Sequence, residues 1–236
     1  MRIAFFGDSL TAGVPGASFF QLVRERLPGD ELINYGKGGD TVISLYRRVR
    51  RLPVERMDIA FLWIGVNDVL VRVSATYPVL KILRGQPWAA GTASFVLHYE
   101  RLVDWLEERS SLVLAVSPLL IGEDADNRWN QRLETMSHRI EELCCGRTNT
   151  RYVDLRRIFL SRLQEKTASP YVPRSAWALL KSALFPVFPE AESGSDHGLH
   201  YTIDGIHLNR DGAVLAAALF VDEILSNAPS LMRVFG

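Results

Sequence analysis

Cysteine is scarce in this sequence: the 236 residues include only Cys144 and Cys145, which are adjacent. Neighbouring cysteines rarely form a disulfide with each other, and two thiols alone do not complete a metal site. The sequence therefore predicts idle or buried thiols in a reducing compartment, rather than a disulfide framework or a metal centre.

An excess of charge is also lacking, because 27 lysines and arginines balance 27 aspartates and glutamates. Proteins that bind nucleic acids or strongly anionic surfaces usually carry a basic excess. We therefore expect no nucleic-acid partner. The composition contains no comparable indication of oligomeric state.

No apolar run stands out as long enough to cross a membrane, so we expect no stable membrane insertion. Met1 leads directly into an apolar run at 2–6, which leaves no room for a charged region, an apolar region and a cleavage site. These two observations predict an intracellular, cytoplasmic protein.

Apolar runs that suit buried strands alternate along the chain with amphipathic patterns that suit helices. The run at 113–116 is continuously apolar, which is typical of a strand covered on both faces. This alternation favours an α/β fold with a five-stranded parallel sheet in the flavodoxin-like order 2-1-3-4-5. The expected strands are 2–6, 31–34, 58–64, 112–117 and 151–154, and the expected helices are 19–26, 41–51, 95–109, 127–143 and 211–225.

Two segments, 69–93 and 164–202, do not fit the alternation and are interpreted as insertions into a single domain spanning 1–236. Each follows an expected strand, so each should emerge at the carboxyl edge of the sheet. Long connections of this kind act as lids or binding loops, or they pack on the domain and bury their aromatic side chains. Both readings stay open. Trp88 and Trp177 are the candidate substrate-binding residues in these segments.

Four polar blocks lie where expected strands end or where a turn precedes a helix. They are Gly-Asp-Ser-Leu at 7–10, the stretch 34–40, Gly-Val-Asn-Asp at 65–68 and Asp-Gly-Ile-His at 204–207. A serine at the carboxyl end of a parallel strand stands where open α/β folds place their chemistry.

In this order, the four blocks resemble those of the SGNH hydrolase superfamily, also called the GDSL esterase/lipase family. The resemblance spans almost the whole chain, and the four signature residues fall on Ser9, Gly39, Asn67 and His207. It implies a three-layer α/β/α sandwich around the parallel sheet.

The resemblance implies that Ser9 is the nucleophile and His207 its base. A hydroxyl is a weak nucleophile at neutral pH, so Ser9 needs such a base. Asp204 lies three residues before His207. If this stretch makes one turn, the Asp204 carboxylate can hold one imidazole nitrogen and leave the other facing Ser9. These three are the expected catalytic residues.

Three hydrogen-bond donors match the family's oxyanion hole: the backbone N–H groups of Ser9 and Gly39 and the side-chain amide of Asn67. Glycine lets the backbone approach a substrate closely, and an amide offers neutral N–H donors. Asp8 and Asp68, which border these blocks, are expected to hold loops through hydrogen bonds to backbone amides.

The expected function is hydrolysis of a carboxylic ester through an acyl-Ser9 intermediate, on a small-molecule or lipid-like substrate. No metal and no organic cofactor is expected. A carbohydrate or metabolite O-acetylesterase, an acyltransferase or a thioesterase would use the same residues. A binding protein on an inactivated hydrolase fold is the rival from another class, since fold does not fix function.

Overall fold

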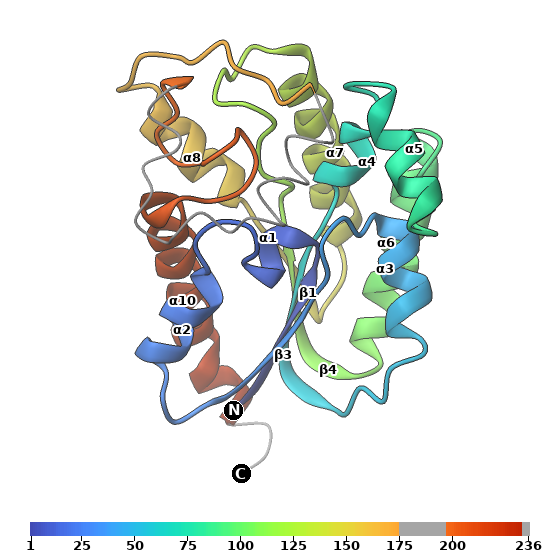
Figure 1. The fold of residues 1–236 in the computed structure, drawn as a ribbon. Helices are drawn as coiled ribbons and strands as arrows, with labels where there is room; N and C mark the ends of the chain where they lie inside the picture. The colour runs from blue at the N-terminus through green and yellow to red at the C-terminus, as the bar shows by residue number, and fades with distance from the viewer. Residues whose placement is uncertain (175–196, 233–236) are drawn as a thin grey trace.

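Five apolar segments form a parallel sheet at the centre of the computed structural model, which describes residues 1–174 and 197–232 (Figure 1). The sheet order is β2-β1-β3-β4-β5, so the predicted fold class and topology are confirmed. The strands are β1 (Arg2–Gly7), β2 (Glu31–Gly36), β3 (Met57–Trp63), β4 (Ser110–Val116) and β5 (Thr150–Val153).

Helices cover both faces of this sheet and complete the predicted three layers (Figure 1). One layer consists of α2 (Phe19–Arg26), α8 (Leu155–Leu163) and α10 (Arg210–Met232), and the other consists of α3 (Val42–Val49), α6 (Thr92–Glu107) and α7 (Arg128–Cys144). The short helices α1 (Ser9–Ala12), α4 (Val66–Leu70) and α5 (Thr76–Leu83) lie near the carboxyl ends of the strands.

Aromatic side chains fill the layer between the sheet and helices α2 and α10. Phe5 of β1 stacks on Phe61 of β3 with ring centroids 4.5 Å apart. Phe220 of α10 contacts Phe61 and Phe19 with centroids 5.0 Å away in each case. Successive strand residues point to opposite faces, so Phe6 instead contacts Trp105 of α6 on the other side. Both faces of the central strands are therefore buried.

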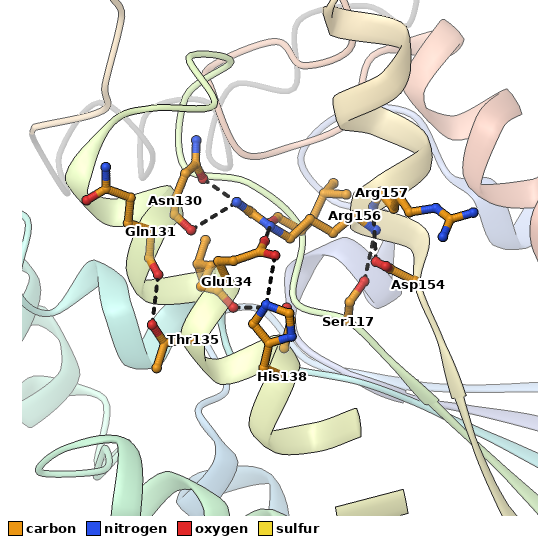
Figure 2. Close-up of polar contacts among 12 residues, drawn as sticks. Ser117, Asn130, Gln131, Glu134, Thr135, His138, Asp154, Arg156 and Arg157 are labelled. Atoms are coloured by element: carbon orange, nitrogen blue, oxygen red, sulfur yellow. Dashed lines mark hydrogen bonds and ion pairs between the residues drawn. The ribbon is translucent and has the colours of Figure 1, made fainter. Parts of the chain in front are cut away.

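A buried arginine joins the loop after β4 to helices α7 and α8 (Figure 2). The Arg156 guanidinium donates to the carbonyl oxygens of Leu119 and Asn130, both at 2.9 Å. Its Nε donates to Glu134 Oε2 at 2.8 Å. A buried cation needs partners of this kind, and here they fix the path of the chain beyond β4.

One helix among the described residues, over Arg210–Pro229, is long and apolar enough to cross a membrane by length and composition. The expectation that no apolar run reaches this length is therefore wrong. The physical reason is visible in the packing: Ala216, Phe220 and Ile224 of this helix are fully buried in the core. The apolar residues of this helix thus form the face that packs into the core.

The first predicted insertion, 69–93, contains α5 and packs against the rest of the chain. Tyr77 of α5 is buried and donates its hydroxyl to the carbonyl oxygen of Pro173 at 2.9 Å. That contact joins the first insertion to the beginning of the second. Residues 175–196 of the second insertion, including Trp177, lie outside the described residues.

Candidate active site

The nucleophile candidate lies on a tight turn between β1 and α1. Gly7 ends the strand, and a Cβ there would lie 2.1 Å from Thr11 Oγ1 and 2.2 Å from the Trp63 carbonyl oxygen. The turn therefore requires glycine at this position. Asp8 caps α1 by accepting the Leu10 N–H at 3.0 Å. Ser9, the first residue of the helix, is held at the carboxyl edge of the sheet.

The structure brings Ser9, His207 and Asp204 into one chain of hydrogen bonds, although Ser9 and His207 are 198 residues apart in sequence. Ser9 Oγ lies 2.9 Å from His207 Nε2, and His207 Nδ1 lies 2.7 Å from Asp204 Oδ2. The other Asp204 oxygen accepts the backbone N–H groups of Ile206 at 3.1 Å and His207 at 2.9 Å. These bonds turn the backbone so that Asp204 and His207 face each other.

Burial and charge act in opposite directions on this pair. Burial alone would raise the pKa of Asp204. The charge of His207 and the hydrogen bonds that the Asp204 carboxylate accepts outweigh burial, so the pKa of Asp204 is lowered. Burial alone would lower the pKa of His207, but the Asp204 carboxylate outweighs it and raises that pKa. Each partner thus favours the charged form of the other, which suits a histidine that receives a proton during a reaction.

The two other predicted donors lie beside Ser9. The Asp40 N–H donates to the Lys37 carbonyl oxygen at 3.1 Å, which forms a turn. Gly39 lies within this turn and has φ +78°, a value that favours glycine. Asn67 lies at the start of α4 and donates from Nδ2 to Asp8 Oδ2 at 3.0 Å. An amide nitrogen carries two hydrogens, so one donor of Asn67 remains for a ligand.

A cavity of about 90 Å³ opens between these residues and α5. Its polar end contains Ser9, Gly39, Asn67 and His207. Its apolar walls are formed by Val14, Pro15, Leu70, Tyr77, Leu80 and Ile206. Trp88 is half-buried and is not among the described residues that line this cavity.

The carboxylates that border the signature residues are buried supports. Asp68 accepts the N–H groups of Val42 at 2.9 Å and Ala89 at 3.0 Å, so it holds two loops as expected. Asp8 accepts from both Leu10 and Asn67. Burial raises the pKa of Asp8 and of Asp68 to about 6 in each case.

Lys81 is a site residue that sequence reasoning missed. Its side chain is 3% exposed, and Nζ donates to Asn67 Oδ1 at 2.8 Å and to the Gly39 carbonyl oxygen. Burial lowers the pKa of Lys81 to about 8, against the opposing effects of Asp68 and Asp8. The sequence offered only a weak signal, because Tyr77 alone lies one helical turn before Lys81 and the surrounding pattern does not show which face of the helix is buried.

The family model for the GDSL-like lipase/acylhydrolase family matches residues 5–215, which is most of the chain. The chain belongs to this family. As a GDSL-like acylhydrolase, it is a carboxylic ester hydrolase. Comparison with curated protein sequences gives no significant match.

Solved structures support the GDSL-like fold. The acetyl xylan esterase AlAXEase is 24% identical with a TM-score of 0.67, covering 95% of this chain and 100% of that one. The acetylxylan esterase Axe2 from Geobacillus stearothermophilus is 16% identical with a TM-score of 0.67, covering 94% and 93%. LAE5, an α/β-hydrolase enzyme from the metagenome of Lake Arreo, Spain, is 18% identical with a TM-score of 0.63 and the same coverage.

Proposed function

We propose that this GDSL-like hydrolase cleaves esters of short carboxylic acids, acetyl esters above all, through an acyl-enzyme on Ser9. The observation that carries the proposal is the continuous Ser9–His207–Asp204 hydrogen-bond chain at the wall of a cavity that Gly39 and Asn67 also line. A nucleophile, a base, an orienting carboxylate and oxyanion donors are what acyl transfer requires.

The proposed first half of the reaction acylates Ser9. His207 Nε2, which lies 2.9 Å from Ser9 Oγ, takes the hydroxyl proton as Oγ attacks the ester carbonyl. The carbonyl π electrons move to its oxygen, and the N–H groups of Ser9, Gly39 and Asn67 bind that oxyanion. Collapse breaks the bond to the alcohol, which leaves with the proton from His207.

The second half of the reaction releases the acid. A water molecule gives its proton to His207 Nε2 and attacks the acyl-Ser9 carbonyl, and the same donors bind the second oxyanion. Collapse returns the proton to Ser9 Oγ and frees the carboxylic acid. Asp204 stays ionised throughout and holds His207 in one tautomer, since its Oδ2 accepts from Nδ1.

Cavity size supports a short acyl group. The space beside Ser9 is about 90 Å³, which is smaller than the engineered cavity of about 150 Å³ that admits benzene. Two of the similar structures are acetyl xylan esterases. In the Geobacillus stearothermophilus enzyme, variants of a serine, an aspartate and a histidine are described as catalytic mutants. Its aspartate precedes its histidine by three residues, as Asp204 precedes His207.

The test is a series of p-nitrophenyl esters with acyl chains of increasing length, assayed on the wild type and on Ser9→Ala. We expect kcat/KM to fall at least about tenfold between acetyl and octanoyl esters, because each methylene group that does not fit loses binding. Ser9→Ala should lose at least about a thousandfold in kcat. The exposed-hydroxyl control Ser161→Ala should behave like the wild type.

Three results would contradict the proposal. Folded Ser9→Ala with wild-type activity would exclude the serine mechanism. A preference for long acyl chains would exclude the short-acyl substrate and favour a lipase. Transfer of the acyl group to an added alcohol in preference to water would identify an acyltransferase that uses the same acyl-enzyme.

A further inference from the structure

Helix α5 places a lysine in contact with two of the three residues proposed as oxyanion donors. Lys81 is almost completely buried, yet it reaches two signature residues that come from different strand ends. Its Nζ donates to Asn67 Oδ1 at 2.8 Å and also to the carbonyl oxygen of Gly39. Figure 1 shows α5 beside α4 at the carboxyl edge of the sheet, so the helix approaches the site from the side.

The Lys81 contact fixes the orientation of the Asn67 amide. The Asn67 oxygen is occupied by Lys81, and one Nδ2 hydrogen is occupied by Asp8 at 3.0 Å. A carboxamide that is held at both ends cannot exchange its oxygen and nitrogen without losing both bonds. Its remaining N–H donor is thereby kept in one direction.

The turn that follows α5 holds the glycine loop in the same way. Gln86 Nε2 donates to the Gly38 carbonyl oxygen at 3.1 Å. In a trans peptide the C=O and the next N–H point in opposite directions, so this bond directs the Gly39 N–H away from Gln86. A Cβ on Gly39 would lie 2.8 Å from Gln86 Oε1 and 3.2 Å from Lys81 Nζ.

We propose that Lys81 is a positioning residue of the oxyanion hole, which fixes the Asn67 amide and the Gly39 loop and adds a positive charge beside both. This inference rests on the proposed ester hydrolysis. It assigns the first insertion, 69–93, a role as the support of the oxyanion hole.

Stability alone does not account for a lysine at this position. Removing a charged group from water is costly, and replacing buried ions by apolar residues of similar volume is often neutral or stabilising. Acidic groups from three other elements surround the ammonium: Asp8 before α1, Asp40 before α3 and Asp68 in α4. These carboxylates raise the pKa of Lys81, whereas Arg84, at the C-cap of α5, lowers it.

The ammonium also makes the site sensitive to alkaline pH. Burial lowers the pKa of Lys81 to about 8, so its charge is present at neutral pH and is lost as the pH rises through this value. The loss removes a positive charge beside the oxyanion donors while the aspartates stay ionised. We therefore expect kcat to fall on the alkaline side.

The first experiment compares Lys81→Met with Lys37→Met in hydrolysis of p-nitrophenyl acetate. Methionine is unbranched like lysine, uncharged and one atom shorter, and the control removes an exposed lysine from the loop that contains Gly39. We expect Lys81→Met to lower kcat by about 10- to 100-fold, less than the loss of a full oxyanion donor, with KM changed less than about threefold. Lys37→Met should stay within about twofold of the wild type.

Two further readouts separate positioning from a general structural effect. The alkaline decline of kcat, with an apparent pKa near 8 in the wild type, should be absent in Lys81→Met. The fold loss from Lys81→Met should be smaller in an Asn67→Ala background, because part of the effect passes through Asn67. Equal fold losses in both backgrounds would overturn the proposal.

Failure of this inference is distinguishable from failure of the proposed function. An active wild type in which Lys81→Met and Lys37→Met have equal kcat overturns the role of Lys81 only. A wild type that hydrolyses no ester overturns both. If Lys81→Met does not fold, the wild-type pH profile decides: kcat that stays flat from about pH 7 to 9.5 contradicts the role of the Lys81 charge.

Discussion

At the scale of single residues, the proposed roles of Asp204 and His207 predict an acid limit of activity. The Asp204 carboxylate raises the pKa of His207, so the imidazole takes up its proton above the ordinary histidine value of about 6.5. Only neutral His207 can accept the Ser9 proton. We therefore expect kcat/KM of the wild type to fall as the pH is lowered through a value above about 6.5.

Asp204→Asn tests this assignment. Without the carboxylate, the pKa of His207 should fall, so the acid limb of the pH–kcat/KM profile should move to lower pH. The asparagine also fails to hold the correct imidazole tautomer, and kcat should drop by about 10³- to 10⁴-fold. An acid limb at the same pH in both proteins would show that another group controls it.

Gly38 and Gly39 offer a matched pair at the proposed oxyanion hole. Gly39 has φ +78° and a Cβ position 2.8 Å from Gln86 Oε1, whereas a Cβ on Gly38 meets nothing within 4 Å. Gly39→Ala should lower the free energy of unfolding by at least about 1–2 kcal/mol and reduce kcat. Gly38→Ala should keep the free energy of unfolding within about 0.5 kcal/mol of the wild type and leave kcat nearly unchanged. Thermal unfolding measures the stability effect, and ester hydrolysis measures the effect on kcat. Equal stability and equal kcat in the two variants would contradict the special backbone conformation of Gly39.

At the scale of elements, Arg156 joins α8 to α7 and to the loop after β4. Arg156→Met removes donors from the buried carbonyl oxygens of Leu119 and Asn130 and separates the ion pair with Glu134. We expect a loss of about 2–4 kcal/mol in the free energy of unfolding, measured by urea titration. The exposed neighbour Arg157 provides the control, since Arg157→Met should cost less than about 0.5 kcal/mol. Equal losses would exclude Arg156 as a support of the fold.

The strands could be predicted because their physical signal is local. The expected runs 58–64 and 112–117 coincide closely with β3 and β4, since the parts covered on both faces, 59–63 and 112–116, are apolar at every position. The short helices α1 and α4 were missed because four and five residues are too few to show helical periodicity.

The signature residues could be predicted from their motifs, but their support could not. Lys81 lies on a helix whose outer face exposes Val79, Ile82 and Leu83, so the local pattern does not show which face is buried. A lysine in such a segment usually lies in solvent. Only the tertiary structure shows that Asn67 and the Gly39 loop enclose it. Whether Trp88 binds substrate stays a prediction, and Trp177 lies outside the described residues.

At the scale of the whole molecule, α10 completes the core that carries the site. Phe220 is fully buried among aromatic rings of β1, β3 and α2, whereas Leu225 of the same helix is 55% exposed. Phe220→Ala should therefore reduce the free energy of unfolding by about 3–5 kcal/mol. Leu225→Ala should cost less than about 0.5 kcal/mol. Similar losses in denaturant titration would contradict the placement of α10 as a core helix.

Covalent labelling of Ser9 tests the central claim most directly. A fluorophosphonate reacts with a serine only when a neighbouring base activates the hydroxyl, and peptide mass spectrometry locates the adduct. We predict one adduct, on Ser9, in the wild type, and little or none in folded Ser9→Ala and His207→Ala. An adduct on another residue, or wild-type labelling of Ser9 in His207→Ala, would contradict the proposed nucleophile and base.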